Sequence, residues 1–343
     1  MRHGRETTAA SRPDGAAAEG PASGLTAAGP SAGDPAAGHR ADGPLTAHTR
    51  REVALADVSL FMVAVVWGFN FVVIKDAIGR IDPMLYVMLR YVVGFVLLAV
   101  IMPRSILTAS RRDWQYGAIL GAFYLSALVI QTYALQWTTP GKSGFITGLS
   151  VAMVPFLYWI IARRSPGLFQ IVGAIVATVG LGFLSLRGDL TISLADGLTL
   201  VGALCYAMHI TATGFFAPKV RPATLAVTQI AVSMVLCLAF TPFVTDITFD
   251  LPGRAWLAIG WTAFSGTVLA FVIQSWAQQR TTSTHAAVLL CLESVFSAVF
   301  GVLFGMDTVT WRLLTGAGLI FSGILIIETL PGRREKREPE AAA

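Results

Sequence analysis

The sequence predicts an all-α polytopic membrane protein in which ten transmembrane helices form two inverted repeats of five helices. Three observations support this prediction. Hydrophobic residues make up 55% of the 343 residues and charged residues only 13%, about half the share of charges in a soluble domain. The apolar runs are continuous and about 20 residues long, which is enough for a helix to cross a bilayer and unlike the alternation of barrel strands. A stretch of the first half also returns in the second half.

The two ends of the chain differ in composition from the rest. Ala, Gly and Pro account for 26 of the first 50 residues, and such a segment cannot bury enough apolar surface to offset its chain entropy. Residues 1–54 are therefore expected to form a disordered tail, and a regulatory role and a neutral extension both remain open. They contain no apolar core followed by a small-residue cleavage site, so we do not expect a secretory signal. Residues 331–343 are expected to form a charged cytoplasmic tail.

The predicted spans follow one another from residue 58 to residue 330, joined by short loops that are marked by Pro or by charge. They are 58–78, 84–102, 114–136, 143–162, 168–186, 194–215, 223–245, 255–278, 285–305 and 312–330. With a cytoplasmic N-terminus, fourteen Lys and Arg residues lie at cytoplasmic span ends and six lie in outer loops. This bias places both termini in the cytoplasm and requires an even number of spans.

An internal repeat divides the spans into two groups of five. The stretch 131–139 reads QTYALQWTT, and 274–282 reads QSWAQQRTT, so five of nine positions are identical at an offset of 143 residues. An offset of 139 relates Trp67-Gly68-Phe69-Asn70 to Tyr206-Ala207-Met208-His209. Because five is an odd number, the second copy should cross the membrane upside down, as in carriers that work by alternating access. The predicted repeats are 55–188 and 189–330.

The tripeptide Gly141-Lys142-Ser143 looks like the end of a phosphate-binding loop. Such a loop needs G-x-x-x-x-G-K-[ST], but the first glycine position holds Gln136 and the second repeat has no counterpart of the tripeptide. A nucleotide site is therefore not expected. The tripeptide is expected to form a turn between the third and fourth spans.

Four segments resemble the EamA branch of the drug/metabolite transporter superfamily. They are GFITGLSVAMVPFLYWIIARRSPGLFQIVGAIVATVGLGFLSL (144–186), LLCLESVFSAVFGVLFGMDTVTWRLLTGAGLIFSGILIIE (289–328), WGFNFVVIKDAI (67–78) and Leu89-Arg90-Tyr91. The resemblance covers about residues 55–330. It implies ten helices, a central cavity lined by both repeats, and transport of small organic metabolites, amino acids or drugs. Two departures are Ser294, where the family usually has Pro, and Met306-Asp307, where it often has Gly-Glu; the first leaves the curvature of the ninth span open.

Three ionisable residues inside the spans are candidate site residues, because such groups are costly in lipid and normally face protein or a wet cavity. Arg90 is a contact for an anionic substrate group, or it snorkels to the surface or forms a structural ion pair. Glu293 is a proton acceptor or cation site, or a packing contact. His209 titrates near neutrality as a free imidazole, or it is a packed, hydrogen-bonded residue. Glu293 and His209 are the candidates for coupling to protons.

Six further residues are candidates to line the cavity, with helix-packing contacts or aromatic belts at the membrane surface as the alternative. They are Trp67, Asn70, Tyr91, Gln131, Tyr206 and Gln274. No cofactor or metal ion is expected. The three cysteines, Cys205, Cys237 and Cys291, lie inside apolar runs without metal-ligand spacing and are interpreted as small hydrophobic residues.

The most consistent function is that of a secondary transporter, more specifically an exporter, in a bacterial cytoplasmic membrane. The bacterial assignment rests on the type of family and the Ala-, Gly- and Arg-rich composition. Its expected partners are a small-molecule substrate and the lipid bilayer; protons, and a monomer or a homodimer, remain open. Nucleic acid is not expected, because the +5 net charge reflects the placement of basic residues around the membrane. A channel, facilitator or lipid scramblase is the alternative. A membrane-embedded enzyme is the least favoured, because no HExxH, GxSxG or acidic pair occurs.

Overall fold

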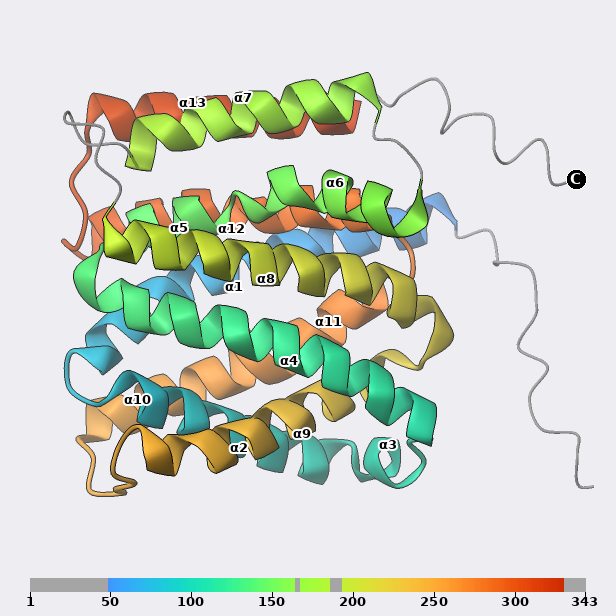
Figure 1. Ribbon diagram of the computed structural model, residues 1–343, viewed down its shortest axis with the longest axis vertical. Coiled ribbons are helices and arrows are strands. Elements are labelled where there is room, and N and C mark those ends of the chain that lie inside the picture. The colour runs from blue at the N-terminus through green and yellow to red at the C-terminus, as the bar shows by residue number, and fades with distance from the viewer. Residues whose placement is uncertain (1–48, 164–166, 186–192, 330–343) are drawn as a thin grey trace, which may run out of the picture. The chain divides into compact units, whose positions relative to one another are not determined.

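The computed structural model describes residues 49–163, 167–185 and 193–329, and the secondary structure of these residues is entirely helical (Figure 1). The predicted tails 1–54 and 331–343 lie outside the described residues, apart from 49–54. The α-helices are α1 (Arg50–Ile78), α2 (Pro83–Ile101), α3 (Pro103–Leu107), α4 (Arg111–Ala134), α5 (Pro140–Thr147), α6 (Ser150–Ala162), α7 (Leu168–Ser185), α8 (Leu194–Phe216), α9 (Pro222–Phe240), α10 (Gly253–Trp261), α11 (Ala270–Ala277), α12 (Ser283–Leu303) and α13 (Trp311–Thr329). A π-helical segment, η4 (Thr262–Leu269), joins α10 to α11.

Eight helical segments of the described chain are long and apolar enough to cross a membrane. They are Arg50–Ile78, Pro83–Ile101, Arg111–Trp137, Pro140–Ile161, Leu194–Lys219, Pro222–Phe243, Gly253–Ala277 and His285–Leu303. Large apolar side chains such as Val100 and Leu257, each 75% exposed, point outward from these helices, where lipid rather than water would cover them. The all-helical, multi-pass prediction is thus confirmed. The count of ten spans and the inversion of the repeats stay predictions.

Helix α1 begins earlier than the sequence analysis placed the first span. Thr49 accepts a hydrogen bond from the backbone N–H of Glu52, and the Glu52 carboxylate accepts one from the backbone N–H of Thr49. This reciprocal cap satisfies two free N–H groups and starts the helix at Arg50. The same arrangement of Ser193 and Asp196 starts α8. The pattern T-x-x-E at 49–52 would have given the correct start.

The tripeptide Gly141-Lys142-Ser143 is not a turn, and that prediction is wrong. It forms the first turn of α5, because Thr139 caps the helix by accepting from the Lys142 backbone N–H at 3.3 Å and Pro140 follows at the first helical position. Proline is favoured there, since its missing N–H would have no partner in the helix anyway. The boundary chosen from the apolar run at 143 was three residues too late.

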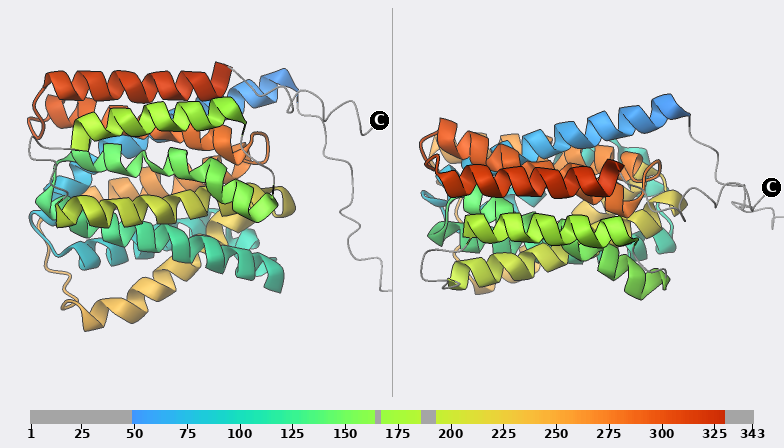
Figure 2. Two further views of the ribbon diagram at one scale, coloured as in Figure 1. Left: turned by 45° about the horizontal axis from the view of Figure 1, so that its top comes forward. Right: turned by 90° about the horizontal axis from the view of Figure 1, so that it is seen from above.

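Helices α7 and α13 lie along each other, as both views of Figure 2 show. The crossing depends on glycines at two levels. A Cβ on Gly180 would lie 2.7 Å from the carbonyl oxygen of Gly316, and a Cβ on Gly323 would lie 2.5 Å from that of Gly173. In membrane helices such small residues allow backbones to approach closely. The contact is reciprocal, because Gly173 and Gly316, like Gly180 and Gly323, are 143 residues apart.

Helices α5 and α12 also cross closely. Ser294 donates a hydrogen bond of 2.7 Å to the carbonyl oxygen of Gly144, and a side chain on Gly148 would collide with Ser294. Helix α12 continues without interruption through Ser294. Asp307 accepts a hydrogen bond of 2.8 Å from the Gly141 backbone N–H, so the acid after α12 helps to hold the start of α5.

Candidate functional site

A cavity lies between α1, α2, α4, α5, α6, α8, α11 and α12 and has a volume of about 40 Å³. Its lining residues are Trp67, Asn70, Phe71, Ile74, Arg90, Tyr124, Leu128, Gln131, Thr147, Gly148, Ser150, Tyr206, His209, Ile210, Gln274, Ala287, Leu290, Cys291, Glu293 and Ser294. Eight of the nine residues singled out from the sequence are among them. The structure therefore brings together polar groups from both halves of the chain.

Tyr91 is the exception, because it is not among the residues that line this cavity. Its side chain is 1% exposed and belongs to the hydrophobic core. Successive residues of an α-helix point about 100° apart. Because Arg90 faces the cavity, the ring of Tyr91 turns into the packing between helices.

Arg90 is fixed by the π-helical segment. The guanidinium is 2% exposed, and its Nε donates a hydrogen bond of 2.8 Å to Thr267 Oγ1. This burial argues against the snorkelling alternative. One turn earlier on α2, the Tyr86 hydroxyl lies 2.6 Å from Thr262 Oγ1, which is also in η4. A segment that departs from α-helical geometry thus sets the position of a buried cation, in keeping with the frequent occurrence of π-turns at functional sites.

The same segment and the last residue of α10 also position α1. The Trp67 indole N–H donates to the carbonyl oxygen of Gly266 at 3.0 Å, and the Trp261 indole donates to Asn70 Oδ1 at 3.0 Å. The sequence analysis did not find η4, since a π-helix has no pattern of its own. The polar residues Thr262, Ser265 and Thr267 inside an apolar stretch were the available signal.

The two coupling candidates differ in their surroundings. Glu293 is only partly buried, because its side chain faces the cavity. His209 is 1% exposed, and its Nε2 lies 3.0 Å from Gln229 Oε1. Its ring packs edge-on against Tyr124, with 5.1 Å between the ring centroids. Glu293 thus lies at the cavity, whereas the imidazole of His209 is buried and has a hydrogen-bond partner in Gln229.

Tyr124 is the centre of an aromatic wall that the sequence analysis missed. Its ring centroid lies 6.2 Å from that of Trp67, 5.3 Å from Tyr206 and 4.5 Å from Phe271. Three residues of α4, at 124, 128 and 131, line the cavity. Their i, i+4, i+7 spacing marks a single helix face, so Gln131 could have pointed to Tyr124.

The fourth predicted span is interrupted at the cavity. Helix α5 ends at Thr147 and α6 begins at Ser150, with Gly148 and Leu149 between them. Thr147, Gly148 and Ser150 all line the cavity. Interrupted helices free backbone groups and occur at the binding sites of carriers. The sequence analysis expected one continuous helix here.

Gln131 and Gln274 occupy equivalent positions of the repeat, and both line the cavity. The Gln131 amide has two partners: its Nε2 donates to Thr147 Oγ1 at 2.6 Å, and its Oε1 accepts from the Tyr206 hydroxyl at 3.1 Å. Neither amide atom of Gln274 has a hydrogen-bond partner within the described structure. The two amides therefore differ in their capacity to bind a ligand.

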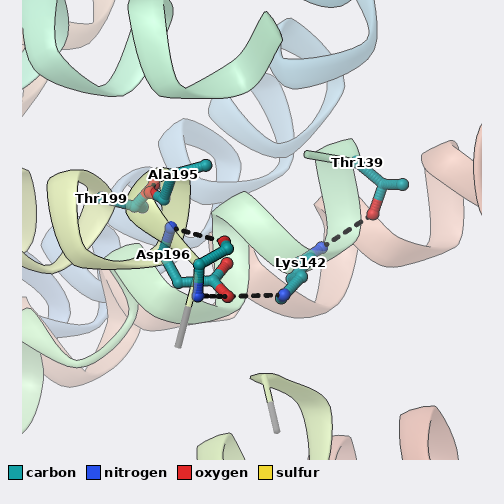
Figure 3. A network of polar contacts seen from close by, with 6 residues as sticks. Thr139, Lys142, Ala195, Asp196 and Thr199 are labelled. Carbon is teal, nitrogen blue, oxygen red and sulfur yellow. Dashed lines mark hydrogen bonds and ion pairs between the residues drawn. The ribbon is translucent and has the colours of Figure 1, made fainter. Parts of the chain in front are cut away.

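An ion pair lies at each end of the cavity-forming helices. Lys142 Nζ, at the start of α5, lies 2.7 Å from Asp196 Oδ2, at the start of α8 (Figure 3). His285 Nε2, at the start of α12, lies 2.9 Å from Asp57 Oδ1, near the start of α1. Lys75 marks the far end of α1, where its Nζ donates to the carbonyl oxygens of 135, 136 and 138, just before α5. Asp57 and Lys75 are separated by roughly 27 Å along α1, at 1.5 Å per residue. Because Asp57 contacts His285 and Lys75 contacts the chain just before Lys142, the two ion pairs lie at opposite ends of α1.

Both aspartates follow a Leu-Ala dipeptide. The tripeptide Leu-Ala-Asp occupies 55–57 and returns at 194–196, an offset of 139. Lys142 and His285 are related by the offset of 143. Each pair thus joins equivalent positions of opposite repeats, and the repeated tripeptide is the signal that the sequence analysis overlooked.

The part of the chain that the structure describes contains no candidate metal site. Among its residues, no group of three or more His, Cys, Asp or Glu side chains is arranged to hold a metal ion. Cys205, Cys237 and Cys291 are free thiols. Of the three, only Cys291 lines the cavity.

Known proteins match the chain over most of its length. The pattern of the EamA-like transporter family matches residues 54–186 and again residues 193–329. An uncharacterized transporter of Archaeoglobus fulgidus is 29% identical over 272 residues, covering 79% of this chain and 85% of that protein. The uncharacterized transporter YoaV of Bacillus subtilis is 23% identical over 278 residues, covering 78% of this chain and 94% of its own length.

A solved crystal structure shares the fold. It superposes with a TM-score of 0.64 at 18% sequence identity, covering 82% of this chain and 99% of that one. The family match occurs twice in the chain, and eight of its helices are long and apolar enough to span a bilayer. The chain therefore belongs to the EamA-like transporter family and is a multi-pass membrane transporter.

Proposed function

We propose that the protein is a secondary transporter that exports a small organic solute, such as a metabolite, an amino acid or a drug, from a bacterial cytoplasm. Two inverted five-helix repeats would rock around the central cavity and open it to one side at a time. The observation that carries this proposal is the pair of equivalent ion pairs, Lys142–Asp196 and Asp57–His285, at opposite ends of the helices around that cavity.

Each ion pair joins one repeat to the other, so opening an end requires the pair at that end to separate. Alternating access needs two such closures that can break independently. A permanently open channel would not require an ion pair that closes each end of the cavity. The reciprocal glycine contacts of α7 with α13 support the same arrangement, because a pseudo-twofold axis brings equivalent positions into exchanged contacts.

Glu293 is assigned to proton coupling in this proposal, with His209 as the second candidate. A coupling group must exchange protons with the side to which the cavity opens. Glu293 is partly exposed to the cavity, whereas His209 is buried and hydrogen-bonded to Gln229. The placement of both termini in the cytoplasm follows from the distribution of Lys and Arg.

The test uses purified protein in liposomes. A thermal-shift panel of amino acids, amines, nucleosides and drugs first selects the solute, which is then followed as a labelled probe. Saturable counterflow of this probe is expected of a carrier, whereas a linear flux without counterflow would favour a channel or facilitator. A reporter fused after residue 190 should lie on the outer side, and a cytosolic reporter would overturn the inverted arrangement.

The variant Glu293→Gln then tests the coupling. It should abolish transport driven by a pH gradient and leave counterflow intact, because exchange of solute needs no net proton movement. His209→Gln is the matched variant for the second candidate. Unchanged gradient dependence in Glu293→Gln would remove this residue from the coupling role.

A further inference from the structure

We infer that Gln274 determines specificity in this cavity: its carboxamide binds a solute group that offers a hydrogen-bond donor beside an acceptor, such as a carboxamide. This inference rests on the proposed transport function and names the substrate class. The expected solutes are small molecules that carry an anionic group and a carboxamide-type edge.

The first observation is the amide itself. The side chain of Gln274 is 1% exposed and lines the cavity, and both its Nε2 and its Oε1 lack hydrogen-bond partners among the described residues. Buried donors and acceptors are almost always paired, since an unpaired one costs about 1–3 kcal/mol. A buried amide with both atoms free and facing a cavity is arranged for a ligand that supplies both bonds.

The repeat explains why this amide is free. Gln131, its equivalent in the first repeat, is held by Thr147 and Tyr206. The position equivalent to Thr147 in the second repeat is Leu290, at the offset of 143, and leucine has no hydrogen-bonding group.

The second partner is lost as well. The position equivalent to Tyr206, at the offset of 139, is Trp67, whose indole N–H is already bonded to the Gly266 carbonyl oxygen. The same glutamine is therefore a structural bridge in one repeat and a free binding group in the other.

The anionic part of the solute class follows from Arg90. Thr267, which accepts from Arg90 Nε at 2.8 Å, lies seven residues before Gln274, or roughly 10 Å along a helix at 1.5 Å per residue. Both Arg90 and Gln274 line the cavity. A compact solute can therefore place an anionic group at the guanidinium and a carboxamide at Gln274.

The experiment compares L-glutamine with L-methionine, which has similar length and the same carboxylate but no amide. Purified wild-type protein should bind L-glutamine at least about tenfold more tightly, the factor that corresponds to about 1.4 kcal/mol. Binding is measured by thermal shift, and transport by counterflow in liposomes. Gln274→Met keeps the side-chain volume and removes the amide, so it should abolish this preference.

Gln131→Met is the matched control. It removes an amide that is satisfied by protein partners, so the melting temperature should fall and the preference for L-glutamine should remain. Gln274→Met should instead raise the melting temperature of the ligand-free protein, because it removes an unpaired buried amide. Gln274→Glu is a second variant. It keeps the shape of the side chain but removes the two N–H donors of the amide, so it should also lose the preference for L-glutamine.

The outcomes separate this inference from the proposed function. Saturable counterflow of a solute without any carboxamide preference in the wild type overturns this inference alone. A preference that survives in Gln274→Met, or in Gln274→Glu if the first variant does not fold, also overturns it. If no solute of the panel shows saturable counterflow, the proposed function fails and this inference fails with it.

Discussion

Lys142 and His285 occupy equivalent positions of the two repeats, and each forms an ion pair with the aspartate of a Leu-Ala-Asp tripeptide in the opposite repeat. The two ends nevertheless differ in chemistry. A lysine ammonium is charged at every physiological pH, whereas an imidazole is charged only when protonated. The duplication has thus kept the contact and changed the cation.

Neutralising one aspartate at a time should shift the opening of the cavity in opposite directions. Asp196→Asn weakens the closure at the Lys142 end, and Asp57→Asn weakens the closure at the His285 end. A partly buried pair contributes about 1 kcal/mol, so each variant should change the open population about fivefold. Cys291, with Cys205 and Cys237 replaced by alanine, reports access to the cavity through its alkylation in vesicles of either orientation. Identical labelling patterns in the two variants would contradict the assignment of the pairs as separate closures.

Thr267→Val should weaken the binding of anionic solutes. The substitution keeps the shape of the side chain and removes the acceptor of the Arg90 Nε hydrogen bond, which leaves a buried charged donor without its partner. The stability loss should be about 1–3 kcal/mol, and KM should rise more than the maximal rate falls. Thr213→Val is the control, because Thr213 Oγ1 bonds only to the carbonyl oxygen of His209 in its own helix. Equal effects of the two variants would show that Thr267 has no special relation to Arg90.

Gly323→Ala should destabilise the contact of α7 with α13. The added methyl group would lie 2.5 Å from the Gly173 carbonyl oxygen, so the two backbones must separate. Gly318→Ala, on the same helix with open space around the glycine, should be neutral or stabilise by up to about 1 kcal/mol through its helix propensity. Melting temperatures in detergent measure both effects. A Gly323→Ala protein as stable as the wild type would rule out this close approach.

A bound solute should protect Cys291 from alkylation and leave Cys237 unaffected. Both thiols are buried, but only Cys291 lines the cavity. The probe is the solute selected by thermal shift, and labelling of single-cysteine proteins is followed by mass spectrometry. Equal protection of both thiols would indicate a general tightening of the fold and not occupation of the cavity.

Much of the fold could be predicted because a membrane helix depends mainly on its own composition. A continuous apolar run of sufficient length fixes the helix whatever its neighbours are. The ends of a helix are set by short capping patterns. The capping residues Thr49 and Thr139 were present in the sequence, but the predicted boundaries did not take them into account. Runs of apolar residues alone therefore gave boundaries that were several residues late.

The site was predictable where the repeat pointed to it. Gln131 and Gln274 were found because they recur at a fixed offset, and Arg90 and Glu293 because charges are rare in spans. The π-helical segment η4 and the break at Gly148–Leu149 were not, since both arise where a helix adjusts to a partner that the sequence does not identify. Sequence alone could not separate Arg90 from Tyr91, because only the packing decides which of two neighbouring residues faces the cavity.

The two halves differ in charge at two of the positions that line the cavity. Arg90 belongs to the first half, and its counterpart at the offset of 139 is the neutral Gln229; Glu293 belongs to the second half, and its counterpart at the offset of 143 is Ser150. The interior therefore carries a basic group on α2 and an acidic group on α12, and the counterpart of each in the other half is an uncharged residue.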